Sequence, residues 1–368
     1  MSGSRLFDPV QLGPLRLRNR VVMAPMTRQF SPGGVPTAEV GDYYVRRAEG
    51  GVGLIISEGL EIAHPASVHS AAIPDLHSEA ALAAWAGIAA RVQAAGAAFV
   101  PQLWHVGGYR ALVADRPRPD VPALSPSGLY RPGERIGAPA GDGDIAAVVE
   151  AYARAAAAAQ AIGCDGVELH GAHGYLIDQF LWAATNRRTD GYNGDVEARS
   201  RFAAEVVAAC RAATSPDFPL FLRFSQWKTQ DYGARLFSTP DELGRFLAVM
   251  AEAGVDVFDC STRRFWTPEF DGSDRTLAGW TRRLSGRPTM TVGSVGLDSD
   301  VVASLHGREQ HSGVGRLDEL DRMLARGEFD LVGVGRALLA DPAWVHKVRR
   351  GALEELIGFD RAQLEVLT

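Results

Sequence analysis

The chain contains the stretch Gly166-Val167-Glu168-Leu169-His170-Gly171-Ala172-His173-Gly174-Tyr175, in which an apolar run breaks off into two histidines and a tyrosine. A short aliphatic segment bounded by glycine is typical of a buried strand. His170 falls where that strand should end, and His173 and Tyr175 follow directly. Because α/β enzymes place their chemistry at strand ends, this stretch predicts both a strand and a candidate site.

Apolar runs of similar length recur along the chain and alternate with helical patterns. We expect further strands at residues 20–28, 52–59, 97–104, 220–225, 255–261, 288–294 and 330–336. Eight strands that alternate with helices, without a shift in composition, predict a (β/α)8 TIM barrel formed by residues 1–368 as a single domain. An open doubly wound α/β sheet is the main alternative, but no GxGxxG follows the first strand.

Three segments do not fit the alternation. Leu15-Arg16-Leu17-Arg18, which follows Gly13-Pro14, predicts a small hairpin that caps the amino-terminal part of the fold. Residues 107–141 are rich in proline and glycine, and residues 263–287 form a second long, irregular excursion, after strands three and six respectively. Because connections of this length in a compact domain usually serve a function, we expect the first to pass over the site.

Composition and charge exclude several functional classes. The 368 residues are 46% hydrophobic and 22% charged, as in an ordinary globular enzyme. The net charge of −6 argues against a nucleic-acid or anionic-membrane surface, since phosphate binding needs clustered Lys and Arg. Cys164, Cys210 and Cys260 are too far apart for a metal motif or a disulfide framework, which favours buried packing. Without a signal region or a run of about 18 apolar residues, we expect a cytoplasmic protein.

In a parallel barrel, the carboxyl end of every strand lies on one rim. The residues expected there are Thr27, Gly59, Gln102, His170, Arg223, Gly293, Gly335 and Arg336. Glycine amides and Arg336 suit a phosphate, and Gln102 offers the paired donor and acceptor that an imide edge requires. Arg223 suits a site where negative charge develops. Together these residue types describe a pocket for a flavin and its phosphate.

Structural roles are open for several of these residues. An HxxH pair can hold a metal or pack in a core, although neither HExxH nor a cysteine cluster is present. Arg223 can instead form a buried ion pair with Glu168 or Glu58. Trp104 can be core packing, and Thr27 can bond the backbone where its strand ends.

Five motifs occur in order along nearly the whole chain: Ala24-Pro25-Met26-Thr27-Arg28, Gln102-Leu103-Trp104-His105, His170-Gly171-Ala172-His173-Gly174-Tyr175, Asn186-Arg187-Arg188-Thr189-Asp190 and Gly333-Val334-Gly335-Arg336. Together they resemble the Old Yellow Enzyme family of flavin-dependent ene-reductases. The resemblance implies an FMN across the barrel mouth. Its ring would lie among Ala24, Pro25, Met26, Thr27, Gly59, Gln102 and Arg223, and its phosphate would contact Gly293, Ser294, Gly335 and Arg336.

The same resemblance implies a reaction. His170 and His173 would hold the carbonyl oxygen of an α,β-unsaturated substrate while reduced flavin gives a hydride to the β-carbon. Tyr175 would protonate the α-carbon, and Trp104 and Trp266 would contact the substrate. Imidazole N–H groups stabilise an enolate as an oxyanion hole does, and a phenol remains protonated at pH 7. NAD(P)H would reduce the flavin through the same pocket, and no metal is implied.

One segment departs from the family pattern. After Arg223 the chain continues with residues 224–232 in place of a short serine–proline turn. With residues 264–266, Tyr109 and Tyr130, this segment predicts an aromatic lid that reshapes the substrate pocket. A tRNA dihydrouridine synthase is the nearest rival, but it would want a basic face and a catalytic cysteine. A flavin-free phosphate-binding barrel is the other alternative, and the sequence leaves a homo-oligomer open.

Overall fold

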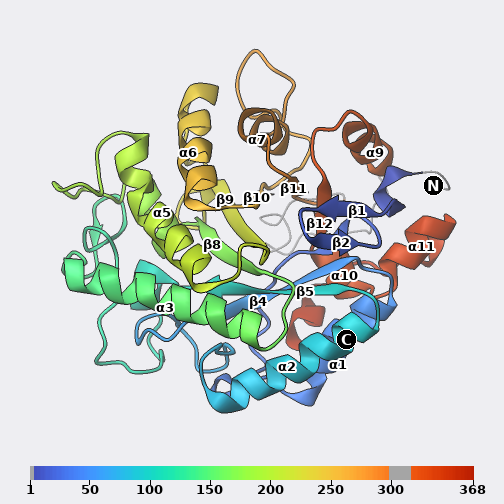
Figure 1. Cartoon of the computed structure of the whole chain (residues 1–368), viewed down its shortest axis with the longest axis horizontal. Helices are drawn as coiled ribbons and strands as arrows, with labels where there is room; N and C mark the ends of the chain where they lie inside the picture. Colours follow the sequence, from blue (N-terminus) through green and yellow to red (C-terminus); the bar gives the residue numbers. More distant parts are fainter. Residues whose placement is uncertain (1–3, 298–315) are drawn as a thin grey trace.

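Eight strands form a closed barrel in the computed structural model, which describes residues 4–297 and 316–368 (Figure 1). The strands are β3 (Val21–Met23), β4 (Leu54–Glu61), β5 (Ala98–Trp104), β8 (Val167–His173), β9 (Leu220–Lys228), β10 (Val257–Ser261), β11 (Thr289–Val292) and β12 (Leu331–Val334). All neighbouring pairs are parallel, and β12 pairs with β3 to close the ring. The predicted TIM barrel is therefore confirmed, and the doubly wound sheet is excluded.

Helices surround the strands (Figure 1). They are α1 (Ala38–Glu49), α2 (Glu79–Ala94), α3 (Asp142–Ala161), α4 (Leu176–Leu181), α5 (Val196–Ala213), α6 (Pro240–Ala253), α7 (Leu277–Ser285), α9 (Leu317–Ala325), α10 (Arg336–Ala340) and α11 (Trp344–Arg350). Local sequence explains where several begin, because the side chains of Thr37, Ser78, Asp195 and Thr239 each accept a backbone N–H of the first turn.

The barrel interior has an apolar layer and a polar layer. Alternation along the strands turns Val100, Phe221 and Val257 inward, where they join one apolar cluster. Two residues further along β5, β9 and β10, the inward positions are Gln102, Arg223 and Asp259, and Glu168 on β8 lies beside Gln102. All four polar side chains are buried. A polar layer thus lies between the apolar layer and the carboxyl ends of the strands.

A hairpin closes the opposite end of the barrel. Strands β1 (Val10–Leu12) and β2 (Leu15–Leu17) pair antiparallel around Gly13, as the sequence predicts. Leu12, Leu15 and Leu17 are buried in the same cluster as Phe221, near the start of β9. The hairpin is therefore part of the barrel core at its amino-terminal end.

The two excursions contain more regular structure than the sequence suggests. Residues 107–141 hold a short 3-10 helix, η3 (Gly107–Leu112), and a small hairpin of β6 (Leu129–Arg131) and β7 (Glu134–Arg135). The prediction that residues 263–287 are irregular is wrong, because they include α7. That helix starts at the Thr276 cap, ends at Gly286 and buries only one face, so its pattern is too short to predict from periodicity.

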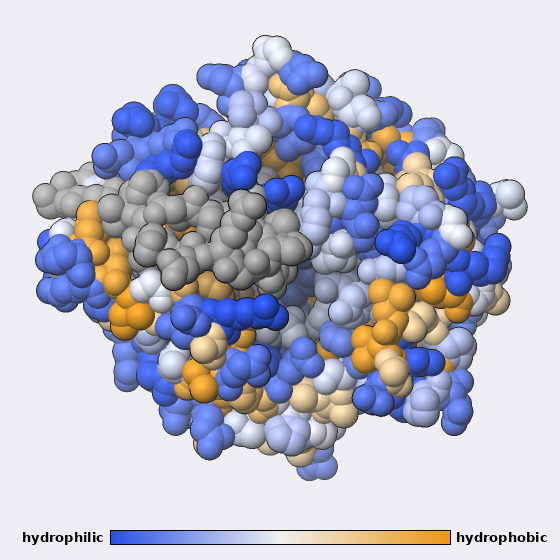
Figure 2. Space-filling view, turned by 180° about the vertical axis from the view of Figure 1, so that it is seen from behind, coloured by the Kyte–Doolittle hydropathy of each residue, from blue (hydrophilic) through white to orange (hydrophobic). Residues whose placement is uncertain are grey.

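The surface is mixed in polarity. Figure 2 shows polar and charged residues interspersed with small apolar areas over one face. Exposed large apolar side chains, such as Leu112 and Ile357, are far apart in the sequence, and single exposures of this kind are ordinary. No helix within residues 4–297 and 316–368 is long and apolar enough to cross a membrane. All three cysteines are buried and free, consistent with packing.

The hairpin generates a stability prediction. Leu17 is 1% exposed, whereas its neighbour Arg16 points to solvent. We expect Leu17→Ala to lower the free energy of unfolding by about 2–5 kcal/mol, because it leaves a cavity in the barrel core. Arg16→Ala, the matched control, should change it by less than about 0.5 kcal/mol. Chemical denaturation of the two variants checks this, and equal stabilities would show that the hairpin is not part of the core.

Candidate active site

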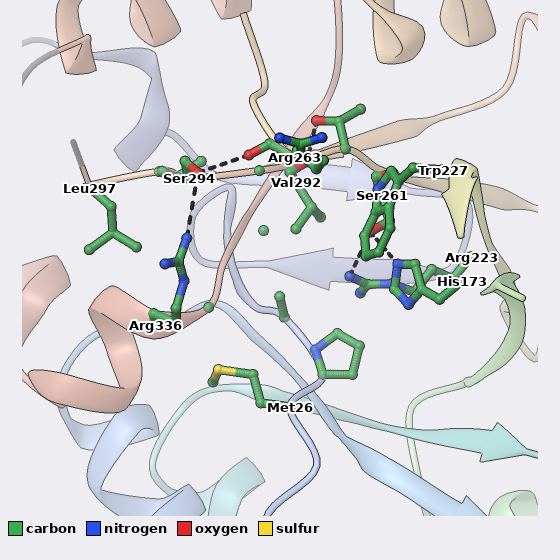
Figure 3. A pocket seen from close by; sticks show the side chains of 17 residues that line it. Met26, His173, Arg223, Trp227, Ser261, Arg263, Val292, Ser294, Leu297 and Arg336 are labelled. Atoms are coloured by element: carbon green, nitrogen blue, oxygen red, sulfur yellow. Dashed lines mark hydrogen bonds between the residues drawn. The ribbon is translucent and has the colours of Figure 1, made fainter. Parts of the chain in front are cut away.

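A cavity of about 190 Å³ opens at the carboxyl ends of the barrel strands (Figure 3). The predicted site residues that line it are Ala24, Pro25, Met26, His173, Arg223, Gly293, Ser294, Gly335 and Arg336. Figure 3 places Arg336 and Ser294 at one end and Arg223, His173 and Trp227 at the other. The cavity therefore brings together residues that are far apart in the sequence, from β8, β9, β10, β11, β12 and the segment after β3.

Several other predicted site residues do not line this cavity: Thr27, Gly59, Gln102, Trp104, His170 and Tyr175. Thr27 is exposed, and Gln102 and His170 are buried in the strands. Gly59 is covered by Trp104, since a Cβ on Gly59 would lie 2.5 Å from the Trp104 ring. In this structure the glycine makes room for the indole.

Trp266 lies elsewhere. Its ring contacts Phe265 at 5.0 Å between centroids, and the Arg316 guanidinium lies 4.2 Å from its centroid. It is not among the described residues that line the cavity.

An ion pair stands at the centre of the polar layer. Arg223 Nη1 lies 2.8 Å from Asp259 Oδ2, and Arg223 Nη2 donates to Ser261 Oγ at 3.1 Å. The two charged side chains are 6% and 0% exposed. The partner is therefore neither Glu168 nor Glu58, the two carboxylates considered from the sequence. Arg223 Nε is buried and has no hydrogen-bond partner among the described residues.

Gln102 is oriented by a second carboxyl group. Its Nε2 donates to Glu168 Oε1 at 2.7 Å, which leaves Gln102 Oε1 without a donor among the described residues. Burial raises the pKa of Glu168 well above its ordinary value, and the neighbouring Asp259 carboxyl raises it further. The amide of Gln102 thus presents an acceptor away from Glu168, as recognition of an imide N–H needs.

The two histidines are neutral hydrogen-bonding groups. Burial is the largest cause that lowers the pKa of both His170 and His173, and the Arg223 charge lowers both further. His170 Nδ1 accepts the Ala172 N–H at 3.3 Å, which places the ring proton on Nε2. His173 Nε2 lies 2.8 Å from Ser261 Oγ, and its ring stacks on Trp227 with centroids 4.4 Å apart. His173 is therefore coupled through Ser261 to Arg223.

Tyr175 packs edge-on against three rings. Its centroid lies 5.0 Å from that of His170, 4.9 Å from Trp104 and 6.0 Å from Tyr109. Burial raises the pKa of Tyr175 above its ordinary value, and the neighbouring tyrosines add to the shift. The phenol therefore stays protonated at neutral pH, beside the imidazole of His170.

The other end of the cavity has the backbone geometry of an anion site. A Cβ on Gly293 would lie 2.6 Å from Thr262 Oγ1, so only glycine fits there. Ser294 has a positive φ of 54° and donates its hydroxyl to Arg263 O at 2.8 Å. Arg336 Nη2 lies 3.5 Å from Ser294 Oγ. Glycine backbone and a guanidinium are donors suited to a phosphate.

Comparison with known proteins identifies the family. Residues 5–355 match the model of the NADH:flavin oxidoreductase / NADH oxidase family. The chain belongs to this family. The assignment confirms the resemblance seen in the sequence motifs and, with it, the prediction of FMN and a nicotinamide hydride donor.

Individual relatives agree with this assignment. The chain is 31% identical over 363 residues to an NADH oxidase of Thermoanaerobacter brockii, covering 95% of this chain but 52% of the relative, so it spans about half of that protein. It is 33% identical to 12-oxophytodienoate reductase 7 of Oryza sativa subsp. japonica, covering 94% and 88%. The structure of morphinone reductase in complex with tetrahydroNAD matches with a TM-score of 0.79 and 28% identity, covering 98% and 93%.

Sequence reasoning missed a role for Glu58. Its Oε2 accepts the backbone N–H groups of Arg28 and Gln29 at 2.9 and 3.1 Å, directly after the segment that lines the cavity. Gln29 has a positive φ of 61°, so the carboxylate holds an unfavourable turn. The only signal in the sequence is an acidic residue within an apolar strand.

Glu58 makes stability depend on pH. Burial raises its pKa from 4.5 to about 7. Between these values the folded protein binds more protons than the unfolded chain, so this group's contribution to stability falls as pH rises. From about pH 5.5 to pH 7 the loss is about 2 kcal/mol.

We therefore expect Glu58→Gln, which keeps an acceptor for the turn, to gain stability relative to the wild type as pH rises through this range. Denaturant unfolding of both proteins at several pH values measures the difference. A constant difference across the range would show that Glu58 titrates near its ordinary pKa.

Proposed function

We propose that this flavin oxidoreductase reduces the activated C=C bond of α,β-unsaturated carbonyl compounds at the expense of NAD(P)H. The observation that carries the proposal is that two neutral imidazoles, His170 and His173, pack against each other beside Arg223, while the protonated phenol of Tyr175 packs against His170. Those groups match the two demands of the reaction, since an enolate oxygen needs hydrogen-bond donors and its α-carbon needs a proton.

The residues present fit a flavin. Ala24, Pro25, Met26 and Thr27, with Gln102 and Arg223, would hold its ring, and Gly293, Ser294, Gly335 and Arg336 would hold its phosphate. Gly59 is covered by Trp104 and would not touch the ring. The unpartnered Arg223 Nε and the available Gln102 Oε1 are a donor and an acceptor of the kind that the polar edge of the ring requires. The chemistry that FMN would supply in this site is hydride transfer, with NAD(P)H as the source and the β-carbon of the substrate as the acceptor.

The two histidines would bind the substrate carbonyl oxygen. Neutral His170 donates from Nε2, because its Nδ1 is already an acceptor. Ser261 accepts from Arg223 and can donate to His173 Nε2, which leaves the proton of His173 on Nδ1. The lowered pKa values keep both rings as hydrogen-bond donors rather than acids at pH 7.

Tyr175 would deliver the proton to the α-carbon. Trp104, which packs edge-on against Tyr175, would form one wall of the substrate pocket. Trp266 does not line the cavity and is not assigned a contact with the substrate. A dihydrouridine synthase would want a basic face and a catalytic cysteine near a strand end, and the charge of −6 and the presence of Tyr175 disfavour it.

The first test is the visible spectrum of the purified protein. We expect flavin absorption bands that are released on denaturation and match FMN, because the cavity has donors for both the ring and the phosphate. Arg336→Met should lower FMN affinity about tenfold by removing a charge-assisted contact to the phosphate. Protein that stays colourless after incubation with FMN would favour the flavin-free barrel.

The second test separates binding from proton transfer. Tyr175→Phe should keep FMN and the rate of flavin reduction by NAD(P)H, but slow reduction of cyclohexenone by about 100-fold, because the phenol proton is lost. Stopped-flow measurement of the two half-reactions checks this. The paired variant His170→Ala with His173→Ala should instead weaken phenol binding, seen as loss of the flavin spectral shift. Unchanged turnover in Tyr175→Phe would assign the proton to water.

A further inference from the structure

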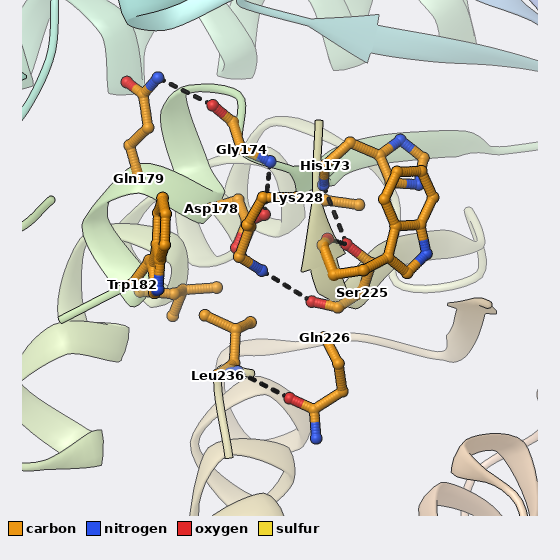
Figure 4. Close-up of polar contacts among 12 residues, drawn as sticks. His173, Gly174, Asp178, Gln179, Trp182, Ser225, Gln226, Lys228 and Leu236 are labelled. Carbon is orange, nitrogen blue, oxygen red and sulfur yellow. Dashed lines mark hydrogen bonds and ion pairs between the residues drawn. The ribbon is translucent and has the colours of Figure 1, made fainter. Parts of the chain in front are cut away.

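A buried ion pair contacts the turn that contains His173 and Tyr175. Lys228, the last residue of β9, places Nζ 2.9 Å from Oδ1 of Asp178 in α4 (Figure 4). Both side chains are 0% exposed. Neither residue lines the cavity, and the proposed chemistry does not use them.

The pair is bonded to the turn from both sides. Asp178 Oδ2 accepts the Gly174 N–H at 2.6 Å. Lys228 Nζ donates to Ser225 O at 3.0 Å, and Ser225 Oγ in turn accepts the His173 N–H at 3.0 Å. Figure 4 shows this sequence of contacts from Gly174 through the ion pair to Ser225 and His173.

The turn needs such support because its backbone is strained. His173 and Gly174 have φ angles of 64° and 80°, and a positive φ is unfavourable for histidine. A Cβ on Gly174 would also overlap the Gln230 side chain, whose Nε2 donates to Gly174 O at 2.8 Å. Thr229 adds a hydrogen bond from its N–H to His173 O at 3.2 Å. The segment that departs from the family pattern therefore anchors the turn.

A buried ion pair is weak as a source of stability. Removing two charges from water costs several kcal/mol each, and well-packed apolar residues often replace such a pair without loss. Because the Lys228–Asp178 pair bonds Gly174 and Ser225, its role is better explained as holding the turn in place.

We propose that Lys228 and Asp178 are positioning residues that fix His173 and Tyr175 relative to each other, so that the oxygen-binding imidazole and the proton donor address one substrate. The proposal rests on the proposed function, because it assigns the pair to that reaction. It also predicts that residues 224–232 are needed for the geometry of the turn as well as for covering the pocket.

The test uses two neutral pairs of nearly equal size in the FMN-loaded enzyme. Lys228→Met with Asp178→Asn keeps an acceptor for the Gly174 N–H, whereas Lys228→Met with Asp178→Leu removes it. The control is Arg211→Met with Asp256→Asn, which removes the ion pair at the opposite end of the same strand, where Asp256 accepts the Leu220 N–H.

Three readouts separate positioning from packing. We expect the leucine pair to keep FMN, to bind 4-hydroxybenzaldehyde about tenfold more weakly and to slow cyclohexenone reduction about tenfold, with faster hydrogen exchange in residues 172–176. The control should stay within about threefold of the wild type. The asparagine pair keeps the Gly174 contact but loses the Lys228 donor to Ser225 O, so its affinity, turnover and exchange should fall between those of the control and of the leucine pair. Wild-type affinity, turnover and exchange in the leucine pair would overturn the proposal.

Two further outcomes are decided by exchange. If the wild-type enzyme does not reduce the enone, the proposed function is wrong. Fast hydrogen exchange in the leucine pair would then still show that the ion pair anchors the turn. If the leucine pair does not fold, hydrogen exchange in the wild-type protein tests the anchoring instead. We expect the Gly174 amide to be at least about tenfold more protected than the amide of the exposed Gly133. Equal exchange at the two glycines would overturn the anchoring.

Discussion

The buried ion pair between Arg223 and Asp259 is the contact on which the site depends. Two charges can remain inside the barrel only because they lie 2.8 Å apart and Arg223 also bonds Ser261. Ser261 then holds His173, so the imidazole is placed by the same guanidinium that faces the cavity. The Arg223–Asp259 ion pair thus places the His173 imidazole through Ser261, and the Arg223 charge helps to keep that imidazole neutral by lowering its pKa.

The polar layer separates the apolar core at the amino-terminal end of the barrel from the candidate site at the carboxyl ends of the strands. Below it, the apolar cluster and the hairpin fill the interior, so the strands are held rigid without any contribution from the site. Above it, Gln102 takes its orientation from Glu168, and Glu168 shares the interior with the Asp259 carboxyl. The recognition groups at the rim are therefore pre-oriented by buried neighbours rather than by exposed loops, which is how a site keeps its geometry without a bound ligand.

Much of this arrangement can be predicted from the sequence, because both the strand period and the common rim of a parallel barrel are local or topological rules. The eight apolar runs correspond to the eight strands, and half of the eight expected rim residues line the cavity: Arg223, Gly293, Gly335 and Arg336. Pairwise contacts between distant residues are not predictable in this way. Asp259 as the partner of Arg223, and Trp104 over Gly59, depend on strand register and on side-chain packing that no single segment encodes. Helix α7 was missed for a different reason, since its 9 residues are too few to establish a helical period.

The departure of residues 224–232 from the family pattern has a structural explanation that differs from a simple lid. β9 continues to Lys228, so the chain runs past the rim before it turns, and this extension brings Lys228 behind His173. The same extension places Trp227 against the His173 ring, on the cavity side. Lys228, which bonds the turn through Asp178 and Ser225, and Trp227, which packs on the His173 ring, are therefore adjacent residues of β9. A change in this segment alters the shape of the pocket and the setting of the imidazole together, which ties substrate choice to the chemistry more closely than a separate loop would.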